Sequence, residues 1–528
     1  MNTTLRRTLA LGTALVLATA ACTDITTEPT STVTGSNIFN DPASYRAFLA
    51  KLYGGLQVTG QEGPAEGDGA GDIEGIDEGF SHYLRQLWQL QELPTDEAVI
   101  GWGDPGLPEM NTQEWGPNNQ FLTAMYYRIY FQVSLANEFL RETTDEKLAS
   151  RGATQALVDE VHQYRAEARF LRALSYWHGV DLFGNIPLVT EASPVGSTPP
   201  QQSTRQAVFD YTVSELNAIL NELPAPGAGQ YGRADQGAVR MVLAKLYMNA
   251  GVYTGQNRYA EARAVLEPVV TSGSYQLDDV YQQVFLADNH TSPEMIFAVP
   301  FDGRNTRTHG GMTFLIHASI GGSMSDAAYG VEGAWWGLRM RPEVYALYGA
   351  GDTRRNVFYT QGHNTQTLGA ISNFTDGVGA PKYRNVTSGG QRGSHANFPD
   401  TDYPMFRLAD AYLMYAEAVV RGGGGNPAQA LAYVNAIRQR AYGNASGNIT
   451  QAQLTTDFIL DERARELFFE GHRRTDLIRY GRFTTAGIWQ WKGGLQQGKL
   501  TESHLNLYPL PGSELGANPN LTQNPGYD

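Results

Sequence analysis

The chain has 528 residues, of which 41% are hydrophobic and only 18% are charged, so it can bury a sizeable core and wholesale disorder is excluded. Asp and Glu number 54 against 39 for Lys and Arg, which gives a net charge of -15 at pH 7. A negative chain without a separate basic patch repels phosphate backbones, so nucleic acid is excluded as a partner. A single cysteine excludes disulfides, cysteine-ligated zinc and iron–sulfur clusters, because each of them needs more than one thiol.

The cysteine, Cys22, directly follows a sequence typical of an export signal. Residues 1–21 have a cationic start at Arg6 and Arg7, an apolar run over residues 9–18 and small residues at their end. The run is too short to cross a bilayer comfortably. Small residues before a cysteine are similar to a bacterial lipobox, where the thiol receives a diacylglycerol. We therefore expect a signal peptide and a lipid anchor on Cys22; the alternative is an ordinary secretory signal.

The remainder divides into a tether and a globular part. Residues 22–36 are rich in Thr and Ser without periodicity, which predicts a flexible tether. The globular part, residues 37–528, opens on Asp41 and Pro42, a helix cap followed by a proline at the first helical position. Apolar residues at three- and four-residue spacing then predict amphipathic helices. These helices are expected over residues 45–56, 121–140, 157–174 and 208–220, with short strands at 185–189 and 293–300.

Two expected helix pairs, over residues 244–266 and 412–437, share a pattern of small and large side chains. Small residues where helices cross, in a unit of roughly 34 residues, are similar to tetratricopeptide repeats. The pairs are not tandem, because an insertion over about residues 272–402 separates them. The sequence therefore predicts a mainly α fold with interrupted tetratricopeptide-like pairs and few short strands. The Gly-rich insertion has the character of loops that carry function on a rigid scaffold.

Several further segments match the sequence motifs of one known family and occur in the same order. They read LQELPTDE at 90–97, EARFLRALSY at 167–176, DLFGNIPL at 181–188, RLADAYLMYAE at 407–417, ERARELFFEGHRRTDLIR at 462–479, YPLPGSE at 508–514 and NPNLTQN at 518–524. In these segments the chain resembles the SusD/RagB outer-membrane lipoproteins, which bind nutrients, chiefly glycans, at the cell surface. The resemblance covers about residues 37–528, although the acidic, Gly-rich stretch 63–79 does not align.

The resemblance implies a helical body with four tetratricopeptide-like pairs and a loop-rich face that holds the ligand. It also implies association with a SusC-like, TonB-dependent outer-membrane barrel that imports the ligand, and a cell-surface location through the lipid anchor. Two other classes stay open: a polysaccharide-degrading surface enzyme, which needs a placed acid–base pair, and a tetratricopeptide-type interaction scaffold, which needs tandem repeats.

The charged signature at residues 462–476 is interpreted as structural. Acidic and basic residues alternate there at helical spacing around Leu467 and Phe468, which predicts ion pairs that hold the helix against its neighbours. A catalytic carboxylate pair is the alternative. Paired acids in glycosidases, however, flank a cleft from separate elements and do not line one helix. We therefore expect no catalytic residue and no enzyme activity.

Two other segments match ligand-binding motifs in part. The GAGQYG segment at 227–232 has dinucleotide-binding spacing, but it follows Pro224-Ala-Pro226 and no strand, so a linker is expected. The stretch 63–79 offers carboxylates for Ca²⁺ without the spacing of an EF-hand, and a solvated loop is the alternative. The carboxylates in question are Asp68, Asp72, Glu74, Asp77 and Glu78.

Aromatic residues in loops are the candidate ligand contacts. Flat apolar rings suit the C–H faces of sugars, and an exposed indole is costly unless it meets a ligand. The family often places such aromatics after the segment 90–97. Trp335 and Trp336 are adjacent and cannot face the same way in extended chain, so one of them at most is expected to contact ligand. The candidates are Trp102, Asp104, Trp115, Tyr329, Trp335 and Trp336.

The alternative for each tryptophan is a buried anchor that pins a long loop. Trp88 and Trp177 lie on expected helices and are assigned to the core on that ground.

Overall fold

A computed structural model of the chain describes residues 38–60, 63–64, 71–196 and 198–527. The chain forms two compact units, residues 1–44 and residues 45–528. Of the first unit, the structure describes a 3-10 helix at Ile38–Asn40 and the start of α2, where Asp41 Oδ1 accepts a hydrogen bond from the Ala43 N–H at 3.0 Å. The signal peptide at 1–21, the lipidated Cys22 and the tether at 22–36 lie outside the described residues.

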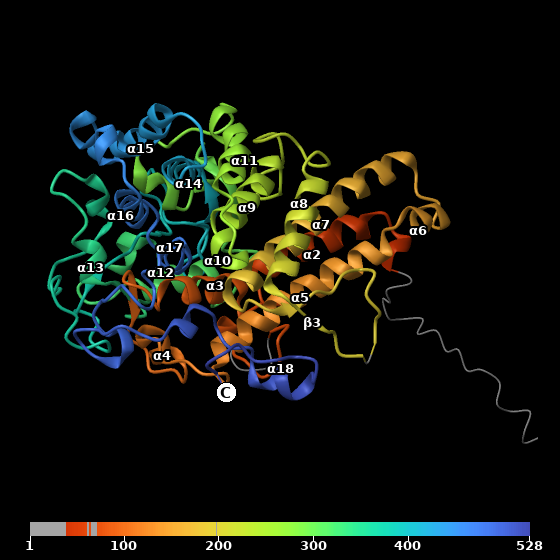
Figure 1. The fold of residues 1–528 in the computed structure, drawn as a ribbon, viewed down its shortest axis with the longest axis horizontal. Helices are drawn as coiled ribbons and strands as arrows, with labels where there is room; N and C mark the ends of the chain where they lie inside the picture. Colours follow the sequence, from red (N-terminus) through yellow and green to blue (C-terminus); the bar gives the residue numbers. More distant parts are fainter. Residues whose placement is uncertain (1–37, 61–62, 65–70, 197, 528) are drawn as a thin grey trace, which may run out of the picture. The chain divides into compact units, whose positions relative to one another are not determined.

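The second unit is mainly helical, as predicted (Figure 1). The α-helices are α2 (Ala43–Gln57), α3 (Tyr83–Glu92), α4 (Leu107–Thr112), α5 (Gln120–Glu142), α6 (Asp145–Ser150), α7 (Gln155–Leu182), α8 (Arg205–Ile219), α9 (Gln236–Met248), α10 (Ala250–Thr254), α11 (Tyr259–Thr271), α12 (Gly311–Ala318), α13 (Pro342–Tyr345), α14 (Leu408–Val420), α15 (Pro427–Tyr442), α16 (Thr456–Leu467), α17 (Arg473–Arg479) and α18 (Gly512–Ala517).

The strands are short and form three small antiparallel sheets among the described residues. Their orders are β1-β5-β6, β2-β3 and β4-β7. The strands are β1 (Ala98–Ile100), β2 (Ile186–Pro187), β3 (Gln202–Ser203), β4 (Met295–Val299), β5 (Leu338–Met340), β6 (Val378–Gly379) and β7 (Tyr403–Arg407).

The two long helices α5 and α7 begin at side-chain caps and pack on each other. Asn119 Oδ1 accepts from the Phe121 N–H at 3.0 Å, and Thr154 Oγ1 accepts from the Leu157 N–H at 3.3 Å, so each cap satisfies a backbone donor that has no partner within the helix. Both helices bury their apolar residues, as their periodicity predicts.

The two predicted tetratricopeptide-like pairs are α9 with α11 and α14 with α15. Although the insertion separates them in sequence, α11 packs against α14, so the pairs are neighbours in space (Figure 1). Arg263 Nε on α11 donates to the Gly423 carbonyl oxygen at 3.1 Å, between α14 and α15. The insertion closes on itself, because β4 pairs with β7 in the register Met295 with Arg407 and Val299 with Tyr403.

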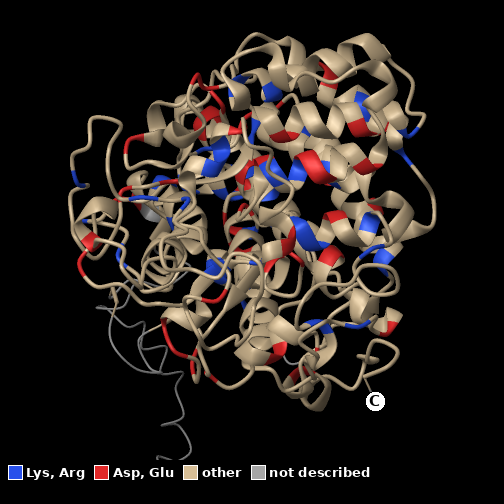
Figure 2. Cartoon of the chain, turned by 90° about the vertical axis from the view of Figure 1, so that its left-hand side faces the viewer, with Lys and Arg blue, Asp and Glu red and all other residues tan. Residues whose placement is uncertain are grey.

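Basic and acidic residues lie side by side on the packed helices (Figure 2), and many of them are buried. Arg407, which ends β7, bonds Glu294 at 2.6 Å, Glu466 at 2.7 Å and Glu470 at 2.6 Å. The charged signature therefore forms the predicted ion pairs, although it is divided between α16, which ends at Leu467, and α17, which begins at Arg473. Glu466 on α16 and Glu470 after it are tied in this way to the end of β7.

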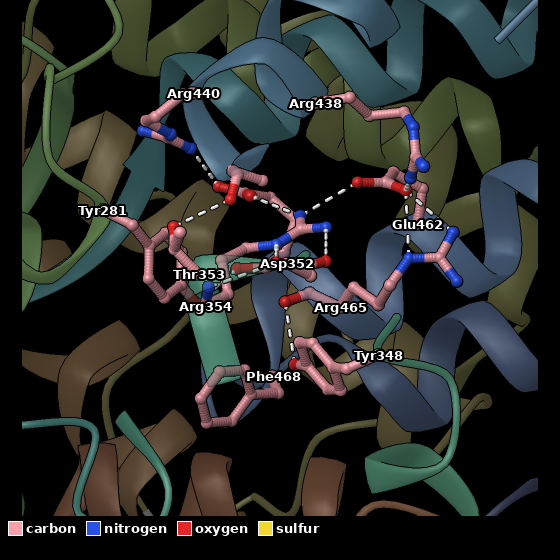
Figure 3. A network of polar contacts seen from close by, with 12 residues as sticks. Tyr281, Tyr348, Asp352, Thr353, Arg354, Arg438, Arg440, Glu462, Arg465 and Phe468 are labelled. Carbon is pink, nitrogen blue, oxygen red and sulfur yellow. Dashed lines mark hydrogen bonds and ion pairs between the residues drawn. The ribbon is translucent and has the colours of Figure 1, made fainter. Parts of the chain in front are cut away.

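Arg354 extends the same network along α16 (Figure 3). Its guanidinium bonds Glu462 and Glu466 at 2.9 Å each and Asp352 at 2.6 Å. Burial raises the pKa of Glu466, but Arg440, Arg407 and Arg354 outweigh it and bring the pKa to about 2. Glu466 is therefore a carboxylate held by arginines, which suits a structural clamp and not proton transfer.

Candidate functional site

Trp102 and Trp335 form the centre of the candidate site. The pairing of β1 with β5 places Ile100 opposite Leu338, so the loop that follows β1 runs beside the segment that precedes β5. Trp102 Nε1 donates to the Trp335 carbonyl oxygen at 2.9 Å, and the two rings have centroids 6.2 Å apart. Both side chains are half-buried. Two of the predicted contacts are therefore brought together by folding.

Gly337 allows the Trp102 ring to lie directly on the backbone. A Cβ at this position would sit 2.7 Å from Trp102 Cε2, closer than van der Waals contact permits. Any larger residue at position 337 would displace the indole. Trp102 is thus held in place by the close contact of its ring with Gly337 and by the hydrogen bond of its indole N–H.

Arg85, on α3, lies beneath the indole. It is 3% exposed, and its guanidinium carbon is 4.2 Å from the Phe314 ring centroid and 5.9 Å from that of Trp102. Neither Nε nor Nη2 has a hydrogen-bond partner among the described residues. Burial lowers the pKa of Arg85 to about 10, while the nearby carboxylates of Asp77 and Asp104 oppose that change.

Arg85 was missed by sequence reasoning. Every residue of α3 is buried, so a cation within this helix needs a reason to be there. Donors left without a partner in the interior cost free energy. Both nitrogens are shielded from solvent by the surrounding rings, so a ligand hydroxyl reaches them only when one of these rings moves. No sequence signal singled it out, because α3 also buries Gln86, Gln89 and Glu92. The predicted residue Asp104 is half-buried and acts electrostatically on Arg85.

His317 supports Trp335 from the opposite side. The two rings stack with centroids 4.8 Å apart and an interplanar angle of 28°. His317 Nδ1 lies 2.6 Å from the Gly333 carbonyl oxygen and Nε2 lies 2.9 Å from that of Asn397, so the ring is held at both nitrogens. Burial lowers the pKa of His317, although both carbonyl oxygens oppose that effect.

The end of the acidic stretch 63–79 supports this surface as well. Glu78 is 1% exposed and accepts hydrogen bonds from Thr308 Oγ1 at 2.5 Å and the His309 N–H at 3.0 Å. A Cβ on Gly79 would lie 3.2 Å from Arg85 Nη1. The part of the stretch that the structure describes therefore positions the loop that carries His309, beside Arg85.

Trp336 is separate from the central pair. Its side chain is 52% exposed, and its ring lies 5.8 Å from that of Phe374. Its φ of 55° falls in the left-handed region, which turns its side chain away from that of Trp335. The two adjacent tryptophans contact different neighbours, because of this turn and not because of the extended chain that the prediction assumed, and Trp335 is the one that faces Trp102.

Trp115 and Tyr329 do not have the placement expected of ligand contacts. Trp115 is 4% exposed, its Nε1 donates to Tyr527 Oη at 2.9 Å, and its ring lies 4.8 Å from that of Tyr508. Tyr329 is 8% exposed and lies under the guanidinium of Arg384 at 5.2 Å. We correct the prediction for both: Trp115 anchors the C-terminal segment, and Tyr329 anchors its own loop.

The part of the chain that the structure describes contains no group of three or more His, Cys, Asp or Glu that could hold a metal ion. Of the acidic residues weighed for Ca²⁺, Glu78 is engaged with the 308–309 loop, Asp72 lies 3.8 Å from Arg128, and Asp68 is outside the described residues. Within the same described ranges, no helix has both the length and the apolar character needed to cross a membrane.

Sequence comparison places the chain beside named proteins. A family described as SusD family matches residues 316–527. The chain is 34% identical to the starch-binding protein SusD of Bacteroides thetaiotaomicron over 96% of each chain. It is also 25% identical to the SusD-like protein P2 of Formosa agariphila, over 97% of this chain and 98% of that protein.

Solved structures share the fold. A SusD homologue from Bacteroides thetaiotaomicron superposes with a TM-score of 0.73 at 21% identity, covering 93% of this chain and 98% of the other. Surface glycan-binding protein A of the same organism, solved with laminarihexaose, superposes with a TM-score of 0.69 at 21% identity, covering 91% and 99%. At these identities the likeness concerns the fold alone.

Proposed function

The chain belongs to the SusD family, and from that premise we propose that it is a cell-surface lipoprotein that binds a neutral glycan at Trp102, Trp335 and Arg85. The observation that carries this proposal is the combination of two half-buried indoles from distant loops with a buried guanidinium that has unpaired donors. Aromatic faces cover the C–H surfaces of a sugar, and charged donors bond its hydroxyls.

The proposed ligand class follows from the relative that is 34% identical to this chain, which is named as a starch-binding protein. A neutral polymer suits the site, because the carboxylates of Asp77, Glu78 and Asp104 near Arg85 would repel an anionic one. Arg85 is held between the rings of Phe80 at 4.7 Å and Phe314 at 4.2 Å before any ligand arrives.

Binding without turnover is part of the proposal. Glu462, Glu466 and Glu470 all lie in buried ion pairs with arginines or a lysine, so they are not available to a substrate. The starch-binding protein SusD and surface glycan-binding protein A are both named as binding proteins. The enzyme alternative would need carboxylates that face the ligand from separate elements.

Delivery is the step that this chain cannot perform alone. A protein held at the membrane through a lipid on Cys22 does not move its ligand across a bilayer, so we propose that a SusC-like, TonB-dependent barrel takes the ligand from it. The family resemblance and the lipobox-like sequence support this step. Co-purification from membranes in mild detergent tests it: a large outer-membrane barrel should accompany the chain, and recovery of the chain without one contradicts the delivery step.

Titration calorimetry with maltoheptaose tests the glycan site. Trp102→Ala and Trp335→Ala should each weaken binding roughly ten- to a hundredfold, the cost of losing an aromatic anchor. Ile488→Ala is the control, because Ile488 is an exposed apolar side chain (56%) outside the site. Wild-type affinity in both tryptophan variants, with an intact fold by circular dichroism, would refute the residue assignment.

A further inference from the structure

A second hollow, of about 470 Å³, opens on the surface without any contribution from Trp102 or Trp335. It lies between the loop that precedes α9, the end of β4 and the segment that precedes β7. The side chains that give it chemical character are Tyr231, His290, Asp302, Arg304, Asp400 and Asp402.

Tyr231 presents a fixed aromatic ring to this hollow. The residue is 42% exposed, although its hydroxyl donates to Asp402 Oδ2 at 2.6 Å. Asp402 is 3% exposed, and its Oδ1 accepts from the Phe301 N–H at 2.7 Å. A tyrosine that is anchored at its hydroxyl and exposed along its ring offers a stacking surface of defined orientation.

The loop that carries Tyr231 is also fixed. Gly232 has a φ of 76°, and a Cβ there would lie 2.5 Å from Pro300 Cγ, so only glycine allows this close approach to the end of β4. The Gly227 N–H donates to Asp235 Oδ2 at 2.6 Å, while Asp235 Oδ1 caps α9 by accepting from Ala238. The GAGQYG segment, predicted to be a linker, is therefore an ordered loop that holds a tyrosine at the hollow.

The polar side chains of the hollow are of two kinds: donors without a hydrogen-bond partner, and carboxylates that already accept hydrogen bonds. The side chains of Arg304 and His290 are exposed and have no hydrogen-bond partner among the described residues. Asp400 Oδ1 accepts from the Gly303 N–H at 2.8 Å and from Ser394 Oγ at 2.6 Å, and its Oδ2 accepts from the Ser394 N–H at 2.6 Å, which leaves one lone pair on Oδ2 for a ligand. A hydroxyl both donates and accepts, so a polyhydroxylated ligand matches this mixture.

The charge of the hollow argues against an anionic ligand. Asp302, Asp400 and Asp402 outnumber the one arginine, and burial raises the pKa of Asp402 only to about 6. Described carboxylates and imidazoles do not gather here in a group that could hold a metal ion. A neutral sugar is the class that matches both the aromatic ring of Tyr231 and the mixture of donors and acceptors around it.

We propose that this hollow is a second sugar-binding site, which takes a neutral glycan unit against the ring of Tyr231 and goes beyond the site at Trp102. The two sites share a wall made of residues 302–309 and 394–400. Gly303 packs into that wall so closely that a Cβ would lie 2.1 Å from the Phe398 carbonyl oxygen. On the other side, the His309 ring lies 5.7 Å from that of Phe398 and 6.5 Å from that of Trp335.

The test uses the full chain in detergent with Trp102 and Trp335 both changed to Ala, so that the first site is silent. Titration with maltoheptaose and with laminarihexaose should reveal residual binding to at least one of them. Adding Tyr231→Ala should weaken that binding roughly tenfold or more, whereas Tyr231→Phe, which keeps the ring, should leave it within about threefold. Tyr127→Ala is the matched control, a half-buried tyrosine whose hydroxyl lies 2.8 Å from Ser513 Oγ outside the hollow.

Residual binding to neither sugar, or binding that Tyr231→Ala leaves unchanged, overturns the proposal. If Tyr231→Ala unfolds the chain, Arg304→Met decides: this exposed side chain has no partner to lose, so the variant should fold and weaken the residual binding about fivefold. An unchanged affinity then overturns the proposal. If the double tryptophan variant binds like the wild type, the Trp102 assignment fails separately, and Tyr231→Ala in the wild-type background still tests the second site.

Discussion

The indole N–H of Trp102 donates to the backbone carbonyl oxygen of Trp335 at 2.9 Å, and the bond joins loops that are 233 residues apart in sequence. Because this bond occupies the N–H, a sugar would meet the faces of the two rings and not the indole nitrogen. The site is therefore a product of the folded chain, and its geometry depends on both loops at once.

Trp102→Phe separates the ring from its hydrogen bond. Phenylalanine keeps an aromatic face but has a smaller ring and lacks the bond that fixes it, so we expect maltoheptaose binding to weaken by about 1 kcal/mol. Trp102→Ala should lose considerably more. Calorimetry on both variants checks the order, and equal losses would contradict a fixed stacking surface.

Arg85→Met should separate stability from binding. Removing a buried guanidinium with unpaired nitrogens relieves a desolvation cost, so the melting temperature should stay the same or rise. Maltoheptaose affinity should fall roughly tenfold, because a charged donor to the ligand is lost.

The matched control for Arg85 is Arg128→Met. Arg128 is also buried (1% exposed), but its Nη2 donates to the Thr59 carbonyl oxygen at 3.2 Å and to Ser81 Oγ at 3.1 Å. That variant should therefore be destabilised, by about 2 kcal/mol or more. Arg85→Met with full affinity, or with a loss of stability like that of Arg128→Met, contradicts a ligand-binding role.

Glu466→Gln should destabilise the chain without a direct effect on the site. Its carboxylate bonds Arg354 and Arg407 in the interior, and breaking such a network typically costs about 3–5 kcal/mol. Arg392→Met is the control, because Arg392 and Glu332 form an exposed pair at 3.3 Å that should be worth under about 1 kcal/mol. Denaturant unfolding compares the two, and similar small losses would rule out the clamp.

The raised pKa of Glu97 predicts that the stability of the chain depends on pH. Burial raises the pKa of Glu97 to about 7, and burial together with Glu97 raises the pKa of its neighbour Glu92. An acid whose pKa is raised in the folded state contributes stability that is present at pH below about 4.5 and is lost as the pH rises through 7. The unfolding free energy of the wild type should therefore fall relative to that of Glu97→Gln, whose side chain stays neutral, across that range, and a constant difference would contradict the shift.

Cys22→Ser tests the anchor that the sequence predicts. The variant should lose acyl labelling and leave the membrane fraction, since the chain's attachment is expected to rest on that lipid. Retention of the variant on membranes after a high-salt wash would mean that something else holds the chain there.

Sequence periodicity predicted the fold well, because the three- and four-residue spacing of apolar residues indicates helices such as α5 and α7. The signature at 462–476 likewise indicated buried ion pairs, since alternating charges around Leu467 leave little other use for them. The site was harder. Trp102 and Trp115 sit in the same kind of loop, yet Trp115 is buried against Tyr508, a contact set by distant packing that no local pattern reports. Arg85 was missed for the same reason, because its orphaned nitrogens exist only once Phe80 and Phe314 enclose it.

A crystal structure of the chain with maltoheptaose tests the central claim most directly. The account predicts a glucose unit stacked on the rings of Trp102 and Trp335, with a hydroxyl in hydrogen-bond distance of Arg85 Nε or Nη2. A sugar bound elsewhere, with both indoles uncovered and Arg85 still without a partner, would contradict it.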